Sequence, residues 1–304
     1  MENNVNAVLF VPDRIQIIQK QVFDSLDVSE NTRKDYSVRI GQFLNFIQLH
    51  GFNLNTFLDY KRYLMSVDTY SVSTKNKYLV SAKVFLDGLY RFQLIPVKLT
   101  DNIKGFTQSK LHKKDGLNDE AILKLQTYCN ELESTITNLR LKAILSLLIF
   151  QGLRQIEISR LNVTDIDLKT KVAFIRGKGR DDKEPIHLHP SAVNILKSYL
   201  TKCRFKEGAL FRSTSNFSNG SRLTTKSIRE LIKQTLDQLN IDGTTHGFRH
   251  FFITKLIKSY KGELLMVSKY SRHRSIQMLD IYNDEVIREQ DLPRFYEVFN
   301  DIKL

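Results

Sequence analysis

Apolar residues recur with helical spacing through the first hundred positions of the chain. The clearest stripe, at i, i+4, i+7, i+8 and i+11, comprises Tyr36, Ile40, Phe43, Leu44 and Ile47. This spacing places the five side chains on one face of a helix, and Ser29 just upstream is suited to cap it. Similar patterns predict a helix over residues 54–65 and another from about Ser73. The pattern therefore predicts a small all-helical unit.

Beyond residue 115 the pattern predicts further helices. Asn118 is suited to cap a helix that starts with acidic residues. Residues 141–149 carry apolar side chains at i, i+3, i+4, i+7 and i+8, which is typical of a buried helix. Additional amphipathic helices are expected over residues 228–239, 248–260 and 292–302.

One short β-hairpin interrupts these helices. Residues 172–175 are β-branched or aromatic, and residues 185–188 alternate apolar side chains with histidine. The intervening sequence is rich in glycine and contains Lys178, which we place in the turn. The predicted fold class is therefore α+β, mainly α with a small β-hairpin or sheet.

The chain is expected to form two domains. Residues 1–100 give a helical domain, residues 116–304 a mixed, mostly helical domain, and residues 101–115 a basic linker without a sustained apolar period. The lysines of this linker are Lys104, Lys110, Lys113 and Lys114. Such a linker is either a solvated loop or a segment that lies along a phosphate backbone.

The chain of 304 residues is strongly basic, with a formal net charge of +13. Residues 1–110 contribute +4 and residues 111–304 contribute +9, so the charge is spread over both domains. An excess of this kind favours a polyanionic partner, either nucleic acid or an anionic membrane surface, although it also serves solubility alone.

Several other classes of protein are disfavoured by the sequence. The longest apolar run, residues 143–150, is far shorter than the ~20 residues of a membrane span, so we expect no membrane insertion. The N-terminus lacks the pattern of a signal peptide. Cys129 and Cys203 are too few for a disulfide scaffold and are compatible with a reducing cytosol. We expect a cytoplasmic, nucleoid-associated protein.

Three polar clusters in the second domain stand out as candidate chemistry. They are Gly152-Leu153-Arg154 followed by Glu157, then His246 with Arg249 in a His-x-x-Arg pattern, then His273 with Tyr282 nine residues later. Each cluster by itself is typical of ordinary solvated or core residues. His187 and His189, two residues apart, are expected to be half-buried strand residues rather than metal ligands.

In this order and spacing, the clusters resemble the tyrosine recombinase/integrase family, especially its compact Xer-like members. There an Arg follows a Gly-Leu pair, a Lys occupies a hairpin turn, a His-x-x-Arg motif follows, and a further His precedes the nucleophilic Tyr by nine residues. The resemblance covers residues 115–290 firmly and residues 15–100, as a core-binding domain, more loosely. Two departures are Arg272, where the family commonly has Gly, and a missing Asn-Pro near the linker.

The resemblance implies a role for each of these residues. Tyr282 is the expected nucleophile, forming a 3′-phosphotyrosyl link, and His246 helps to remove its proton. Arg154 and Arg249 bind the scissile phosphate, since forked guanidiniums match phosphate oxygens. Lys178 is the expected general acid, and His273 is expected to donate a hydrogen bond to the phosphate. Glu157 is expected to support the site. One phosphodiester is exchanged for another, so no cofactor and no metal are expected.

The leading functional hypothesis is site-specific recombination of double-stranded DNA, either Xer-like resolution or integration and excision of a mobile element. The resemblance implies a tetramer on paired sites, in which a C-terminal segment of about residues 291–304 packs on a neighbouring subunit. The alternative that this segment packs on its own domain stays open. So do two other functions, a type IB topoisomerase-like DNA relaxase and a non-catalytic DNA-binding or architectural protein.

Overall fold

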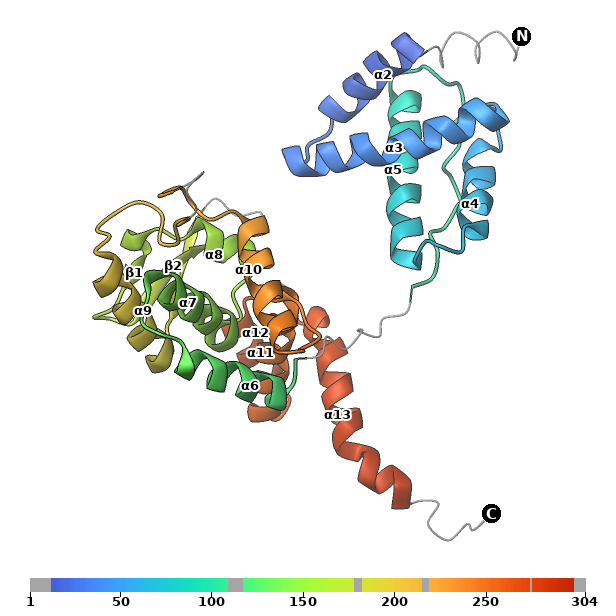
Figure 1. Cartoon of the computed structure of the whole chain (residues 1–304). Coiled ribbons are helices and arrows are strands. Elements are labelled where there is room, and N and C mark those ends of the chain that lie inside the picture. Colours follow the sequence, from blue (N-terminus) through green and yellow to red (C-terminus); the bar gives the residue numbers. More distant parts are fainter. Residues whose placement is uncertain (1–11, 109–116, 178–181, 215–218, 274, 298–304) are drawn as a thin grey trace. The chain divides into compact units, whose positions relative to one another are not determined.

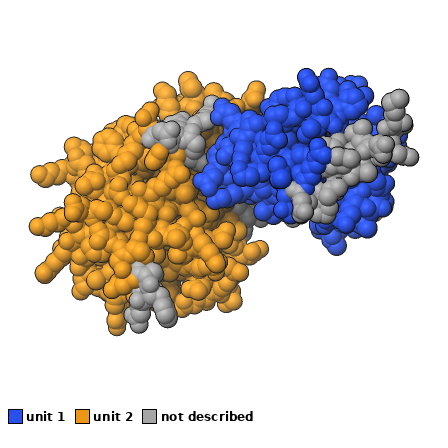
Figure 2. Space-filling model, turned by 90° about the horizontal axis from the view of Figure 1, so that it is seen from above, with its two compact units in different colours: residues 1–110 blue, residues 111–304 orange. Residues whose placement is uncertain are grey.

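The computed structural model describes residues 12–108, 117–177, 182–214, 219–273 and 275–297. The chain divides into two compact units, residues 1–110 and 111–304, which Figure 2 shows in blue and orange. The first unit is helical, and the second combines helices with a small antiparallel sheet (Figure 1). The predicted α+β fold class is confirmed.

Four helices form the described part of the first unit. They are α2 (Pro12–Asp24), α3 (Glu30–His50), α4 (Thr56–Ser66) and α5 (Val72–Arg91). The Ser29 side chain accepts a hydrogen bond from the Thr32 amide, which confirms the predicted cap of α3. The third predicted helix, α5, begins slightly earlier than expected, because Ser71 caps it. Helix α2 was not among the predicted elements.

The polypeptide that follows α5 continues to pack on the first unit. Ile103 and Phe106 contact its apolar core, and the Asn76 side chain bonds both the amide and the carbonyl of Phe106. The start of the expected linker is therefore held against α5. Lys104 is exposed to solvent. Lys110, Lys113 and Lys114 lie outside the described residues.

Eight α-helices and a short 3₁₀-helix, Val163–Asp165, lie in the described part of the second unit. The α-helices are α6 (Asp119–Glu131), α7 (Ile136–Gln151), α8 (Gln155–Arg160), α9 (Pro190–Cys203), α10 (Thr225–Gln238), α11 (Thr245–Ser259), α12 (Leu264–Ser271) and α13 (Gln277–Glu297). The predicted Asn118 cap is confirmed, since its side chain accepts a bond from the Ala121 amide. Helix α7 is buried over most of its length, and α9 and α11 both pack against it.

The sheet has the strand order β1-β2-β3, from β1 (Ile166–Asp167), β2 (Val172–Arg176) and β3 (Lys183–His187), which are antiparallel. The predicted hairpin is confirmed, although β3 begins two residues earlier than expected. Ile175 lies opposite Glu184. Lys178, between β2 and β3, lies outside the described residues.

The two histidines near β3 differ from expectation. His187 ends the strand and is exposed, and His189 lies beyond the strand as the N-cap of α9. Its Nδ1 accepts a bond from the Ser191 amide at 3.2 Å, and its ring stacks on Phe150. Helix capping therefore explains His189.

Helix α13 carries both Tyr282 and most of the predicted terminal amphipathic segment. Its first part packs on α11 and α12, and its second part extends away from those helices (Figure 1). Leu292 and Tyr296 are exposed in this second part. Residues 298–304 lie outside the described residues. Over the described ranges, none of the helices is long and apolar enough to cross a bilayer.

Candidate active site

A tight turn between α7 and α8 presents Arg154. Helix α7 ends at Gly152, which has a left-handed conformation with φ of 55°. A Cβ atom at this position would lie 2.3 Å from Cδ1 of Phe252 on α11, so both the backbone and the packing require glycine. Two residues later Arg154 is the N-cap of α8. The turn therefore fixes where Arg154 enters the site.

Glu157, one turn into α8, holds the Arg154 side chain in place. Its Oε2 accepts a bond from the Arg154 amide at 2.8 Å, and its Oε1 accepts one from Arg154 Nη1 at 3.0 Å. The carboxylate is 1% exposed. Burial would raise the pKa of Glu157, but Arg272, the Arg154 amide and the neighbouring guanidiniums outweigh burial and hold this pKa below its ordinary value. Glu157 is therefore an ionised carboxylate that orients Arg154.

Arg249, on α11, is a buried cation. Its Nη1 donates to the Gly152 carbonyl at 2.7 Å, and its Nη2 donates to the Ser271 carbonyl. Burial first, and then the nearby charge of Arg154, lower the pKa of Arg249 to about 9, so the group stays protonated at neutral pH. Among the described residues, Arg249 forms no salt bridge with a carboxylate. The positive charge of Arg249 is thus available to an anion.

His273 lies beside Arg249 as a neutral imidazole. Its Nδ1 is 2.8 Å from Ser271 Oγ, and its Nε2 is 3.4 Å from Arg249 Nη2. Burial, and then the charges of the surrounding arginines, lower the pKa of His273 to about 3. Because a guanidinium only donates, Nε2 accepts in this arrangement and Nδ1 carries the proton.

Two histidines of α11 and the tyrosine of α13 form a group of aromatic rings. The rings of His246 and His250 are 4.5 Å apart, and those of His250 and Tyr282 are 5.2 Å apart, both in edge-to-face geometry. The start of α11 is also tied to α8, because Thr245 Oγ1 donates to Gln155 Oε1. These contacts bring the His246 motif and Tyr282 to the same end of the unit as Arg154.

Tyr282 is 6% exposed and belongs to a small apolar cluster. The other buried members of this cluster, from α11, α12 and α13, are Ile253, Ile257, Val267, Leu279 and Val286. This packing fixes the position of α13 against α11, and thereby the position of the phenol relative to the histidines.

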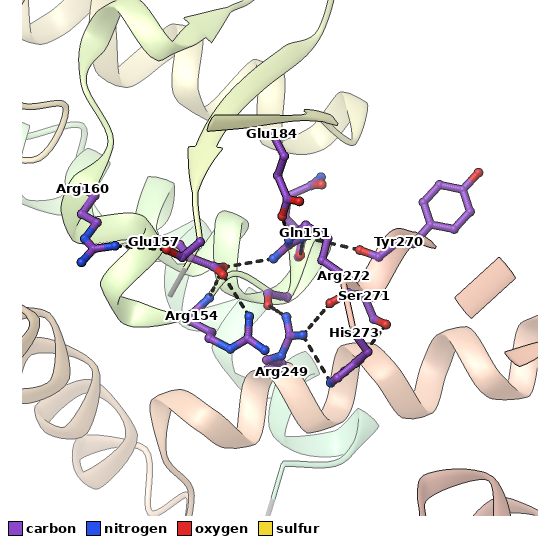
Figure 3. Close-up of polar contacts among 12 residues, drawn as sticks. Gln151, Arg154, Glu157, Arg160, Glu184, Arg249, Tyr270, Ser271, Arg272 and His273 are labelled. Carbon is purple, nitrogen blue, oxygen red and sulfur yellow. Dashed lines mark hydrogen bonds and ion pairs between the residues drawn. The ribbon is translucent and has the colours of Figure 1, made fainter. Parts of the chain in front are cut away.

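A second buried arginine, Arg272, completes the polar network. Its Nη2 donates to Glu157 Oε2 at 3.0 Å, its Nε lies 3.5 Å from Glu184 Oε1, and its Nη1 bonds the Gln151 carbonyl. Figure 3 shows Arg154 and Arg272 converging on Glu157, with Arg249 and His273 beside them. Arg272 lies directly before His273 in the chain, at the left-handed cap of α12.

The structure thus gathers Arg154, His246, Arg249, His273 and Tyr282 in one region, with Glu157 as an orienting carboxylate. Sequence reasoning assigned no role to Arg272, Glu184, Ser271 or His250. The only sequence signal for them was the unusual Arg272 before His273. Over the described ranges, no group of three His, Cys, Asp or Glu side chains is arranged to hold a metal ion.

Comparison with known proteins decides the family. The model of the phage integrase family matches residues 117–288, more than half of the chain, including every described residue of this site. This chain belongs to the phage integrase family. The family assignment confirms the tyrosine recombinase resemblance that the order of Arg154, His246, Arg249, His273 and Tyr282 indicated.

Within this family, curated relatives are named tyrosine recombinases. One from Synechocystis sp. is 29% identical over 164 residues, which make up 53% of this chain and 52% of that protein. The tyrosine recombinase XerC of Leptospira interrogans is 24% identical over 268 residues, covering 84% of this chain and 83% of XerC. The chain spans about half the length of the Synechocystis relative and of one from Agathobacter rectalis.

Solved structures share the fold of this integrase family member. The crystal structure of the XerH site-specific recombinase bound to palindromic difH substrate has a TM-score of 0.70 at 19% identity, covering 91% of this chain and 83% of XerH. A lambda integrase dimer bound to a COC′ core site has a TM-score of 0.64 at 13% identity, covering 87% and 92%. At these identities the likeness concerns the fold alone.

Proposed function

We propose that the chain is a site-specific tyrosine recombinase that cuts and rejoins duplex DNA through a covalent link to Tyr282. The observation that carries this proposal is the pair of guanidiniums, one held by Glu157 and one buried without an ion-paired carboxylate, beside a tyrosine and two histidines. A phosphodiester supplies the negative charge that this arrangement lacks.

Arg154 and Arg249 act on the phosphate. Their forked N–H groups bind the non-bridging oxygens and stabilise the charge that develops as the phosphorus takes a fifth oxygen. Because Glu157 and the Gly152 carbonyl hold the two side chains before DNA arrives, little reorganisation accompanies binding. Removing one preorganised donor of this kind typically lowers a rate by ~10²–10³.

Tyr282 is the nucleophile. A phenol with an ordinary pKa of ~10 is mostly protonated at neutral pH, so attack requires a base. We assign this role to His246, and the ring of His250 contacts the rings of both His246 and Tyr282. The Tyr282 oxygen bonds to phosphorus, the bond from phosphorus to the 5′ oxygen breaks, and a 3′-phosphotyrosyl link and a free 5′ hydroxyl result.

Lys178 and His273 complete the reaction. Lys178, in the connection between β2 and β3, gives its proton to the departing 5′ oxygen. His273 donates a hydrogen bond from Nε2 to the phosphate, which requires the tautomer that carries its proton on Nε2. In that tautomer Nδ1 accepts a hydrogen bond from the Ser271 hydroxyl, which is able to donate as well as to accept. The free 5′ hydroxyl of a second strand then attacks the phosphotyrosine, so the exchange needs neither metal nor ATP.

The partner is double-stranded DNA, bound by a tetramer in which a C-terminal segment of about residues 291–304 reaches a neighbouring subunit. The net charge of +13 supports a DNA partner. The match to XerC over 84% of the chain is too long for the second unit alone and extends into the helical unit, which favours recombination over a topoisomerase-like relaxase. A tetramer on paired sites distinguishes these two functions, because a relaxase acts as a monomer.

The test is capture of the covalent intermediate. Duplexes selected from a random pool for binding to the full chain are given a nick near each candidate site, so that a short 5′-hydroxyl fragment diffuses away after cleavage. We expect an adduct that survives denaturing electrophoresis with the native chain. Tyr282→Phe is the matched control and should bind the same duplexes without forming an adduct. Binding without any adduct in the native chain would leave the architectural alternative as the function.

A further inference from the structure

We infer that Arg272 is a positioning residue that joins the phosphate-binding arginine Arg154 to the hairpin containing Lys178. Two carboxylates, Glu157 on α8 and Glu184 on β3, share this one guanidinium. The inference rests on the proposed recombinase function and specifies how two of its catalytic groups are held in register.

The backbone at Arg272 has a left-handed conformation that favours glycine. Arg272 caps α12 with φ of 57° and ψ of 41°, a left-handed conformation in which a Cβ atom crowds the following carbonyl. Glycine adopts this conformation without that crowding. The backbone itself therefore gives no reason for an arginine at this cap, and the reason lies in the contacts that its side chain makes.

The side chain makes those contacts in the interior. It is 7% exposed, and its nitrogens face Glu157 Oε2 at 3.0 Å, Glu184 Oε1 at 3.5 Å and the Gln151 carbonyl at 3.3 Å. Burial lowers the pKa of Arg272, and the two carboxylates raise it. The two terminal nitrogens donate hydrogen bonds to Glu157 and to the Gln151 carbonyl, whereas Nε is buried without a hydrogen-bond partner and faces Glu184 as an ion pair only.

Two of these contacts lead to segments that supply catalytic groups. Glu157 binds Arg154 through the opposite carboxylate oxygen, so Arg272 fixes the orientation of that carboxylate. Glu184 lies on β3, opposite Ile175 on β2, and Lys178 belongs to the connection between these strands. The chain continues from Arg272 directly into His273. One buried cation therefore connects the segments that supply Arg154, Lys178 and His273.

A second arginine holds the same hairpin from its other strand. Arg160, at the end of α8, donates from Nη1 to the carbonyl of Gly177, the residue before Lys178, at 3.1 Å. The hairpin is thus attached to α8 directly through Arg160 and indirectly through Glu184, Arg272 and Glu157. Figure 3 shows this arrangement, with Arg160 and Glu184 on either side of Glu157.

The position of Arg272 predicts a separation of DNA binding from cleavage. Because the side chain is buried, its removal should leave DNA affinity within about twofold, whereas misplacement of catalytic groups by about 1 Å lowers rates by about 10²-fold. For Arg272→Gly, which also relieves the backbone, we expect single-turnover adduct formation to fall by about 10- to 100-fold. Arg272→Lys keeps the charge without the fork and should restore only part of the rate.

The chain offers a matched control in Arg204. This arginine also caps a helix in the left-handed conformation, with φ of 56° at the end of α9, but it is exposed. Arg204→Gly makes the same change of residue at the same kind of cap. We expect it to cleave DNA at the native rate, so a rate loss confined to Arg272→Gly reflects the buried contacts.

The experiment that tests the inference replaces the bridging 5′ oxygen of the scissile phosphate by sulfur. A thiolate leaves without a proton, so a defect in proton delivery by Lys178 disappears on this substrate, whereas a defect in phosphate binding by Arg154 persists. Glu184→Gln, which weakens only the hairpin arm, should cleave ordinary DNA slowly and the sulfur substrate at the native rate. Glu157→Gln should stay slow on both, and Arg272→Gly should recover in part.

The outcomes separate this inference from the proposed function. If the native chain forms no adduct on either substrate, the recombinase proposal itself fails. If the native chain forms the adduct and Arg272→Gly cleaves ordinary DNA at the same rate, Arg272 has no positioning role. A slow Glu184→Gln that does not recover on the sulfur substrate would disprove the connection to Lys178.

Discussion

The two units of this molecule differ in the burial of their charged side chains. In the described part of the first unit most ion pairs are exposed neighbours on one helix, such as Glu30 with Lys34, and the core contains aromatic contacts such as that of Phe43 with Tyr60. In the second unit Glu157, Arg249 and Arg272 are buried beside one another. Burying charge is costly even when it is paired. The proposed reaction gives these buried charges a use, because they would act on a bound phosphate.

The largest effect is expected when a buried charge is replaced by an apolar side chain. Arg249→Met keeps the length of the side chain but loses the bonds to the Gly152 and Ser271 carbonyls and the charge offered to phosphate. Single-turnover cleavage should fall by ~10²–10³. The counterpart in the first unit, Arg39→Met, removes an exposed pair with Asp35 and should leave the cleavage rate unchanged. Equal losses in the two variants would refute the contrast.

Glycine substitutions sharpen the contrast through stability. Gly152→Ala forces a left-handed backbone and a clash with Phe252, so it should destabilise the second unit by ~2–4 kcal/mol. At Gly41, within α3, an added Cβ would have no neighbouring atom within 4 Å, and Gly41→Ala should stabilise the first unit by ~0.5–1 kcal/mol. Urea denaturation monitors both changes. A stabilising Gly152→Ala would contradict the account of the turn.

The pH dependence of stability provides a further test. In the unfolded chain His273 titrates near its ordinary pKa of 6.5, whereas in the folded chain its pKa is about 3. Between these values the unfolded chain binds one more proton, so stability falls as the pH drops through this window. His273→Asn removes this contribution. The urea midpoint of the variant should decline less between pH 7 and pH 5 than that of the native chain, and parallel declines would show that His273 is not neutral.

The smallest effect is expected for the exposed pairs of the first unit. A hydrogen bond from Lys34, and then its positive charge, lower the pKa of Glu30. Both side chains are nevertheless largely exposed to solvent. Water and salt screen such pairs, so Lys34→Ala should leave the urea midpoint unchanged within error and be insensitive to added salt. A clear loss of stability would show that the first unit also depends on its charges.

Local signals in the sequence were sufficient for much of the fold. Apolar stripes and cap residues such as Ser29 and Asn118 predict α3, α5, α6 and α7, because these features depend only on residues a few positions apart. Helix α2 was not predicted, although Ile15, Ile18 and Val22 have helical spacing. His189 was assigned to a strand because alternation alone does not reveal that the following Pro190 starts a helix.

The site was predictable only as far as the order of its motifs. Arg154, Arg249 and Tyr282 stand at spacings that the family resemblance identifies. The contacts of Arg272 were not predictable, because its carboxylate partners lie 115 and 88 positions earlier in the chain, in α8 and β3. Long-range pairs of this kind arise from the tertiary fold, which brings the end of α12 to α8 and the hairpin, and no local pattern encodes them.

The central claim is that Tyr282 carries DNA during the reaction, and mapping the adduct tests it most directly. The trapped complex is digested with nuclease and protease, and the modified peptide is identified by mass spectrometry, while the released strand is probed for a free 5′ hydroxyl. The account predicts a nucleotide joined through its 3′ phosphate to Tyr282. A nucleotide on another residue, or a 5′-phosphate linkage, would contradict it.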